Sequence, residues 1–114
     1  MPLLKIQTNQ PVDATAQKDL AGRASQTVAE LLGKPERYVM VSIEHNPAML
    51  FGGSDEPLAY LELKSIGLPE SQTTDLSRSL CDLLKDTLDL PADRIYIEFA
   101  DAPRSMWGWN GGTF

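Results

Sequence analysis

The stretch LAGRASQTVAELLGKPERYVMVSI, residues 20–43, contains the pattern that decides the fold. Its apolar side chains first recur at helical spacing, at Leu20, Ala24, Val28, Leu31 and Leu32. Gly33 and Pro35 then end the helix, because glycine readily adopts the left-handed conformation just past a helix and proline follows it. Residues 38–43 alternate between two faces with a period of two, which predicts a strand.

A strand is also predicted before this stretch, over residues 3–8, because Leu4 and Ile6 fall on one face of an extended chain. The helix begins near Asp13, so the first half of the chain has the order strand, helix, strand. Strands joined through a helix are normally parallel, and these three segments therefore form a β-α-β unit.

The second half repeats this order after a loop over residues 45–57, which contains two prolines and the pair Gly52-Gly53. Residues 58–66 alternate as a strand, and residues 94–99 form another. Between these strands lies a second amphipathic helix, whose apolar stripe consists of Leu76, Leu80, Leu83, Leu84 and Leu88. The chain is thus predicted to contain two β-α-β units.

Two such units predict an α/β (α+β) fold, a four-stranded mixed sheet with two helices on one face. All 114 residues belong to one domain, residues 1–114. The tail over residues 100–114 is too short to cover the opposite face of the sheet. We expect that face to be apolar and exposed, and therefore to pack against another copy of the chain in an oligomer.

The composition excludes several classes of function. A net charge of -6 and a pI near 4.6 argue against nucleic acid or an anionic membrane as the partner. With one cysteine, Cys81, and one histidine, His45, the chain offers neither a disulfide framework nor a cysteine-based metal site. The sequence shows neither an export signal nor a membrane span, so we expect a cytoplasmic location, with leaderless secretion as the alternative.

Pro2 is the first residue that suggests chemistry. We expect Met1 to be removed, because methionine before a small residue is usually clipped, and this leaves a proline secondary amine as the terminus. An ordinary α-amino group has a pKa of roughly 7.7–8.0. Burial or a nearby cation lowers that pKa, and a neutral amine can act as a general base. The alternative is that Pro2 has no chemical role.

Lys34 and the C-terminal tail are two further candidates. Lys34 either completes the end of the helix or binds a substrate carboxylate and lowers the pKa of the terminal amine. The tail contains both tryptophans and a terminal phenylalanine. These rings either fill a core or subunit interface, or line a pocket for an aromatic substrate.

An ordered set of short motifs resembles the macrophage migration inhibitory factor family of the tautomerase superfamily. The matches extend along nearly the whole chain, in the same order. They are Met1-Pro2-Leu3 with Thr8-Asn9, Gly33-Lys34-Pro35, Phe51-Gly52-Gly53-Ser54 with Glu56-Pro57, Ser65-Ile66-Gly67, Asp93-Arg94-Ile95-Tyr96-Ile97, and Gly108-Trp109-Asn110 with Thr113-Phe114.

The resemblance implies a homotrimer with active sites at the subunit interfaces, and phenylpyruvate and dopachrome tautomerase activity. Pro2 would be the catalytic base and then acid, acting on a small aromatic α-keto acid. The substrate would be held by Lys34 and Ile66, and Tyr96 would come from the neighbouring subunit. Trp109 and Phe114 would form the walls. The resemblance implies no metal and no cofactor.

Two departures from the family's pattern affect this expectation. Thiol oxidoreductases of the family carry Cys-Ala-Leu-Cys where this chain has Leu58-Ala59-Tyr60-Leu61, so that redox motif is absent. Glu98 stands where animal members often have asparagine. If Glu98 faces the pocket, its charge repels an anionic substrate and raises the pKa of Pro2. Alternatively, Glu98 pairs with Lys34 or another neighbour.

The sequence leaves a second class of function open. A cytokine-like or binding protein of the same fold would have the same motifs, and its pocket would be incidental. A structural trimer with an occluded pocket is a third interpretation. The keto–enol tautomerase remains the leading hypothesis.

Overall fold

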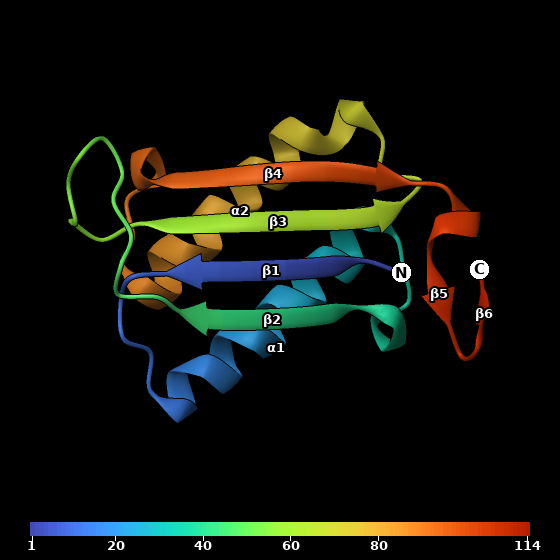
Figure 1. Ribbon diagram of the computed structural model, residues 1–114, viewed down its shortest axis with the longest axis horizontal. Coiled ribbons are helices and arrows are strands. Elements are labelled where there is room, and N and C mark those ends of the chain that lie inside the picture. The colour runs from blue at the N-terminus through green and yellow to red at the C-terminus, as the bar shows by residue number, and fades with distance from the viewer.

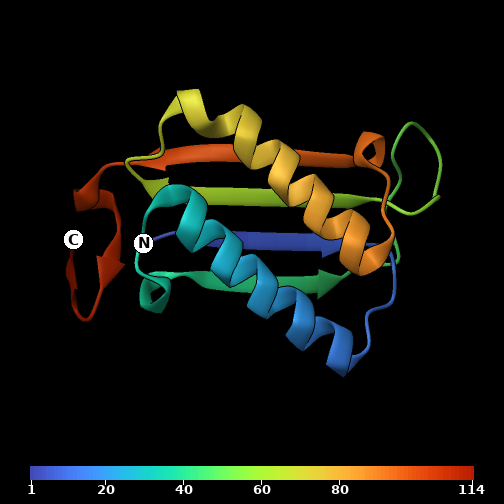
Figure 2. The same ribbon diagram turned by 180° about the vertical axis from the view of Figure 1, so that it is seen from behind.

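The computed structural model describes all residues, 1–114, as one four-stranded sheet with two helices packed on one face (Figures 1 and 2). The order across the sheet is β2-β1-β3-β4. A small two-stranded hairpin follows at the C-terminus. The elements are β1 (Leu3–Thr8), α1 (Ala14–Leu32), β2 (Met40–His45), β3 (Ala59–Ile66), α2 (Thr73–Leu88), β4 (Ile95–Ala102), β5 (Gly108–Trp109) and β6 (Gly112–Thr113).

The predicted topology is confirmed. Strand β1 pairs in parallel with β2, and β3 pairs in parallel with β4, so each helix connects two parallel neighbours. The two units join where β1 and β3 pair in antiparallel orientation at the centre. Strand β2 begins later than predicted because residues 36–38 form a short 3-10 helix, in which the Tyr38 N–H bonds to the Pro35 carbonyl at 3.0 Å.

Local caps fix both ends of α1. The Asp13 carboxylate accepts a hydrogen bond from the Ala16 N–H at 2.8 Å, which satisfies one of the free donors of the first turn. Gly33 ends the helix with φ of 63°, a conformation that glycine adopts without steric cost. The Lys34 N–H donates to the Ala29 carbonyl at 3.0 Å. This bond fixes the backbone of Lys34 against the last turn of the helix.

The core lies between the sheet and the helices. Its central members come from β1, α1, β3 and α2 and are completely buried, namely Leu4, Ile6, Leu20, Ala24, Val28, Leu61, Leu63, Leu80 and Leu84. Leu61 and Leu63 point toward the helices because alternate residues of a strand face opposite sides. The same alternation sends their neighbours to the open face.

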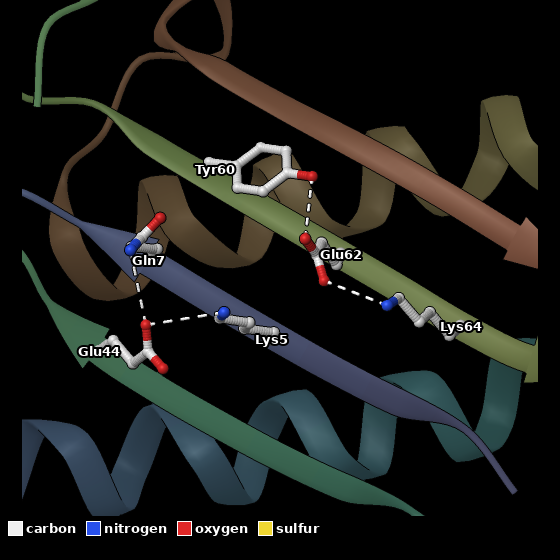
Figure 3. Close-up of polar contacts among 6 residues, drawn as sticks. All are labelled: Lys5, Gln7, Glu44, Tyr60, Glu62 and Lys64. Carbon is white, nitrogen blue, oxygen red and sulfur yellow. Dashed lines mark hydrogen bonds and ion pairs between the residues drawn. The ribbon is translucent and has the colours of Figure 1, made fainter.

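That open face is polar, so our expectation of an apolar exposed face was wrong. Figure 3 shows charged and polar side chains from β1, β2 and β3 gathered there. The Lys5 ammonium lies 3.8 Å from the Glu44 carboxylate, and the Lys64 ammonium lies 3.6 Å from that of Glu62. A surface of this kind is stable in water. The open face therefore gives no hydrophobic reason for an oligomer.

None of the helices has both the length and the apolar character that crossing a membrane requires.

Thr8 is a buried polar residue that joins the end of β1 to the loop before β3. Its hydroxyl donates to the Leu58 carbonyl at 2.8 Å and accepts from the Gln10 N–H at 3.2 Å, and the side chain is inaccessible to solvent. We predict that Thr8→Val, which keeps the shape and removes the hydroxyl, lowers the free energy of unfolding by about 1–3 kcal/mol. Urea denaturation measures the change. Thr8→Ser keeps the hydroxyl and is the control. A Thr8→Val protein as stable as wild type would contradict the prediction.

Candidate active site

A cavity of about 410 Å³ lies at the end of the sheet where the chain begins. Figure 1 places the N-terminus and the β5–β6 hairpin at this same end, and the 3-10 helix that precedes β2 also lies there. The lining side chains are mostly apolar or aromatic. They belong to Met1, Pro2, Leu3, Arg37, Tyr38, Val39, Met40, Trp107, Trp109 and Phe114, with Gly108 contributing backbone.

Pro2 lines this cavity and is bonded to the neighbouring strand. Its ring is fully buried, and its carbonyl accepts a hydrogen bond from the Met40 N–H at 2.9 Å. That bond continues the β1–β2 pairing by one residue, so Pro2 belongs to the sheet rather than to a frayed terminus. Burial lowers the pKa of the adjoining Met1 amino group, and the positive charge of Lys34 lowers it further.

Two cations stand near the terminus, and only one was expected. Lys34 is half-buried and close enough to act electrostatically on the Met1 amine, but it does not line the cavity. Arg37 does line the cavity, and its guanidinium carbon lies 4.8 Å from the centre of the Tyr38 ring. Sequence reasoning missed Arg37 and Tyr38. Their position in the turn before β2 was the available signal, since β2 pairs with the strand that carries Pro2.

Three aromatic rings form a packed wall. Trp109 and Phe114 are stacked with centroids 5.3 Å apart, and Tyr38 meets both edge-on at 5.5 and 5.7 Å. Such arrangements are favourable for aromatic pairs. The hairpin reverses at Asn110 and Gly111, both with positive φ, as the tight turns of two-residue hairpins require. The turn thereby brings Phe114 back beside Trp109.

Three expected site residues lie elsewhere in the chain. The register pairs Gln7 with Tyr60 and Tyr60 with Tyr96, so Tyr96 lies at the opposite end of the sheet from Pro2. It is 66% exposed and packs against Phe51, with ring centroids 4.5 Å apart. Ile66 is buried at the end of β3, level with the terminus, and does not line the cavity.

Glu98 lies on the open face of the sheet, away from the cavity. Its carboxylate accepts a hydrogen bond of 2.6 Å from the Tyr60 hydroxyl, so its partner is Tyr60 rather than Lys34. This bond is the main reason that the pKa of Tyr60 is raised, and Glu62, 3.1 Å from the same hydroxyl, adds to the effect. One chain therefore brings together Pro2, Trp109 and Phe114, and leaves Tyr96, Glu98 and Ile66 outside.

The chain contains no cluster of three or more histidine, cysteine or acidic side chains that could hold a metal ion. The cavity has the chain terminus at its edge, with a partly buried Met1 amino group and the buried Pro2 beside it, and it also has nearby positive charge and aromatic walls. These groups can bind a small aromatic anion and move a proton.

Comparison with known proteins relates this geometry to a family. The sequence model of the family described as "Macrophage migration inhibitory factor (MIF)" matches residues 1–114. A macrophage migration inhibitory factor homolog of Brugia malayi is 42% identical, over 100% of this chain and 99% of its own. The macrophage migration inhibitory factor of Mus musculus is 36% identical with the same coverage.

Solved structures agree with the sequence comparison. The crystal structure of a macrophage migration inhibitory factor homologue from Prochlorococcus marinus has a TM-score of 0.93 and 48% identity, over 98% of each chain. The macrophage migration inhibitory factor of Toxoplasma gondii has a TM-score of 0.93 and 32% identity, covering 98% of this chain and 99% of its own. The chain belongs to the macrophage migration inhibitory factor family, and so to the tautomerase superfamily.

Proposed function

We propose that this protein is a keto–enol tautomerase of the phenylpyruvate and dopachrome type, with Pro2 as the catalytic base after removal of Met1. The observation that supports this most is the position of Pro2, which is buried directly before β1, lines a largely apolar and aromatic cavity and has positive charge nearby. A nitrogen in that environment is easily kept neutral, and a neutral amine is what a general base requires.

The proposed reaction is a proton transfer between carbon and oxygen. The neutral nitrogen of Pro2 takes a proton from the carbon next to the keto group of an aromatic α-keto acid. The electron pair of that C–H bond forms the carbon–carbon double bond of the enol, and the carbonyl electrons move to oxygen. The protonated Pro2 then returns a proton to that oxygen. The reverse sequence converts enol to ketone, and no cofactor takes part.

Positive charge assists in two ways. The substrate carries a carboxylate throughout, and negative charge grows on its oxygen as the proton leaves. Lys34 and Arg37 are the cations beside the cavity, so they are the groups proposed to hold the carboxylate and stabilise the growing charge. The rings of Trp109 and Phe114 exclude water and orient the aromatic part of the substrate.

Tyr96 belongs to this proposal only if a second copy supplies it, because it lies at the opposite end of its own sheet. We therefore propose a homotrimer in which Tyr96 of one subunit enters the cavity of the next. Ile66, at the end of β3 beside Pro2, would bind the substrate through its backbone. Glu98 lies two residues beyond Tyr96 on the same face. Its carboxylate would select against substrates with an anionic ring substituent, since like charges repel.

Replacing Pro2 tests the base directly. We predict that Pro2→Gly lowers kcat/KM for phenylpyruvate by about 10²-fold or more, the usual contribution of general acid–base catalysis. Formation of the enol is followed by absorbance, and the intact mass of each protein establishes that Met1 is absent. Pro11→Gly, an exposed proline at the far end of β1, is the matched control. If wild type and Pro2→Gly are equally slow, the enzyme is excluded and a binding or cytokine-like protein is favoured; if both are equally fast, Pro2 is not the base.

Lys34 is predicted to set the pH dependence. The neutral amine is the active form, so kcat/KM rises with pH through the pKa of the terminus and then levels off. The positive charge of Lys34, after burial, lowers the pKa of the Met1 amino group, and we expect the same effect on the Pro2 amine once Met1 is removed. Lys34→Ala is therefore expected to raise the pKa of the Pro2 amine and to move the acidic limb to higher pH. Lys34→Arg keeps the charge and leaves the limb in place. Lys18→Ala, on the exposed side of α1, is the control. An acidic limb that does not move in Lys34→Ala contradicts this role.

A further inference from the structure

Arg94 binds a loop through hydrogen bonds to backbone carbonyls rather than through an ion pair. Its side chain is half-buried at the start of β4 and forms no ion pair with any carboxylate. It donates instead to backbone carbonyls of the loop over residues 46–58. The contacts are Nη1 to Phe51 at 2.7 Å, Nη2 to Ser54 at 3.0 Å, Nη2 to Glu56 at 2.9 Å and Nε to Pro57 at 3.4 Å.

These bonds fix a tight turn. Phe51 and Ser54 exchange two backbone hydrogen bonds, of 3.0 and 3.1 Å, around Gly52 and Gly53, which both have positive φ. The guanidinium of Arg94 also donates to the carbonyls of Phe51 and Ser54, each of which already accepts a bond within the turn. One planar group thus stabilises the turn through both carbonyls. A lysine in this place has three donors on one nitrogen and cannot reproduce the fork.

The same guanidinium also contacts the side chain that borders Tyr96. Its central carbon lies 5.1 Å from the centre of the Phe51 ring, and that ring packs on Tyr96 at 4.5 Å with 40° between the planes. Arg94, Phe51 and Tyr96 thus form a continuous series of contacts. Tyr96 is 66% exposed, and Phe51 is the aromatic ring that packs against it.

We propose that Arg94 is a positioning residue that acts through Phe51 to hold Tyr96 in the orientation needed by the neighbouring subunit's cavity. This inference rests on the proposed function, in which Tyr96 contacts substrate bound beside another subunit's Pro2. Arg94 itself touches no substrate. Its effect therefore falls on substrate binding, while the base at the far end of the sheet is unaffected.

Kinetics with phenylpyruvate test this in the full-length protein after removal of Met1. Arg94→Ala and Tyr96→Ala are each expected to raise KM about tenfold, a typical coupling between residues in contact, with the acidic limb of the pH profile unchanged. In the Tyr96→Ala background, Arg94→Ala is expected to change KM no further. Arg78→Ala removes an exposed arginine of α2 and is the control, with an unchanged KM. An equal increase in KM in both backgrounds overturns the proposal.

Arg94→Lys covers the case in which Arg94→Ala does not fold. Lysine keeps the positive charge but cannot make the several hydrogen bonds of the guanidinium. We expect Arg94→Lys to have the raised KM expected of Arg94→Ala. A wild-type KM for Arg94→Lys overturns the proposal. If Pro2→Gly abolishes turnover while Tyr96→Ala leaves KM unchanged, the tautomerase with Pro2 as its base stands, and both the role of Tyr96 and this inference are wrong.

A measurement without substrate tests the positioning of Tyr96 by Arg94 independently of tautomerase activity. In NMR spectra, nuclear Overhauser effects between the Phe51 and Tyr96 rings are expected in wild type and lost in Arg94→Lys, while those of the core remain. If these contacts persist, Arg94 does not position Tyr96, whether or not the protein is a tautomerase.

Discussion

The pairing of the first strand on both sides is the constraint on which the structure depends. Strand β1 lies between β2 and β3, and the Met40 N–H extends the pairing to the Pro2 carbonyl. Chain termini are usually mobile and solvated. Here the Pro2 carbonyl is bonded to a sheet that has helices on one face, and burial and the charge of Lys34 lower the pKa of the Met1 amino group next to it. The role proposed for Pro2 depends on that placement.

Periodicity predicted most of the fold because it reports burial directly. Spacing alone placed Leu4 and Ile6 on one face of a strand and the apolar residues of each helix on one stripe. The structure buries them, except for the partly buried Leu31, Leu32 and Leu88. The same alternation could have identified the polar open face, since Tyr60, Glu62 and Lys64 fall between core residues. The absence of a second covering layer does not make a sheet face apolar, because the side chains that alternate with the core decide its polarity.

The candidate site was only partly predictable, for a geometric reason. Pro2 and Lys34 stood out by chemistry, and the aromatic tail by composition. That Tyr38 and Arg37 join them depends on the parallel pairing of β2 with β1, which places the turn before β2 beside the terminus. The hydrogen bond between Tyr60 and Glu98 likewise depends on strand register, which spacing within one segment does not reveal.

The central claim is that the fold keeps the terminal nitrogen of Pro2 neutral near physiological pH. It is tested most directly by titrating ¹⁵N-proline-labelled protein in NMR, after mass spectrometry establishes that Met1 has been removed. The account predicts a titration midpoint below the ordinary α-amino range of roughly 7.7–8.0. A midpoint within or above that range would mean that the nitrogen is mostly protonated at neutral pH, and would contradict the account even though the fold stands.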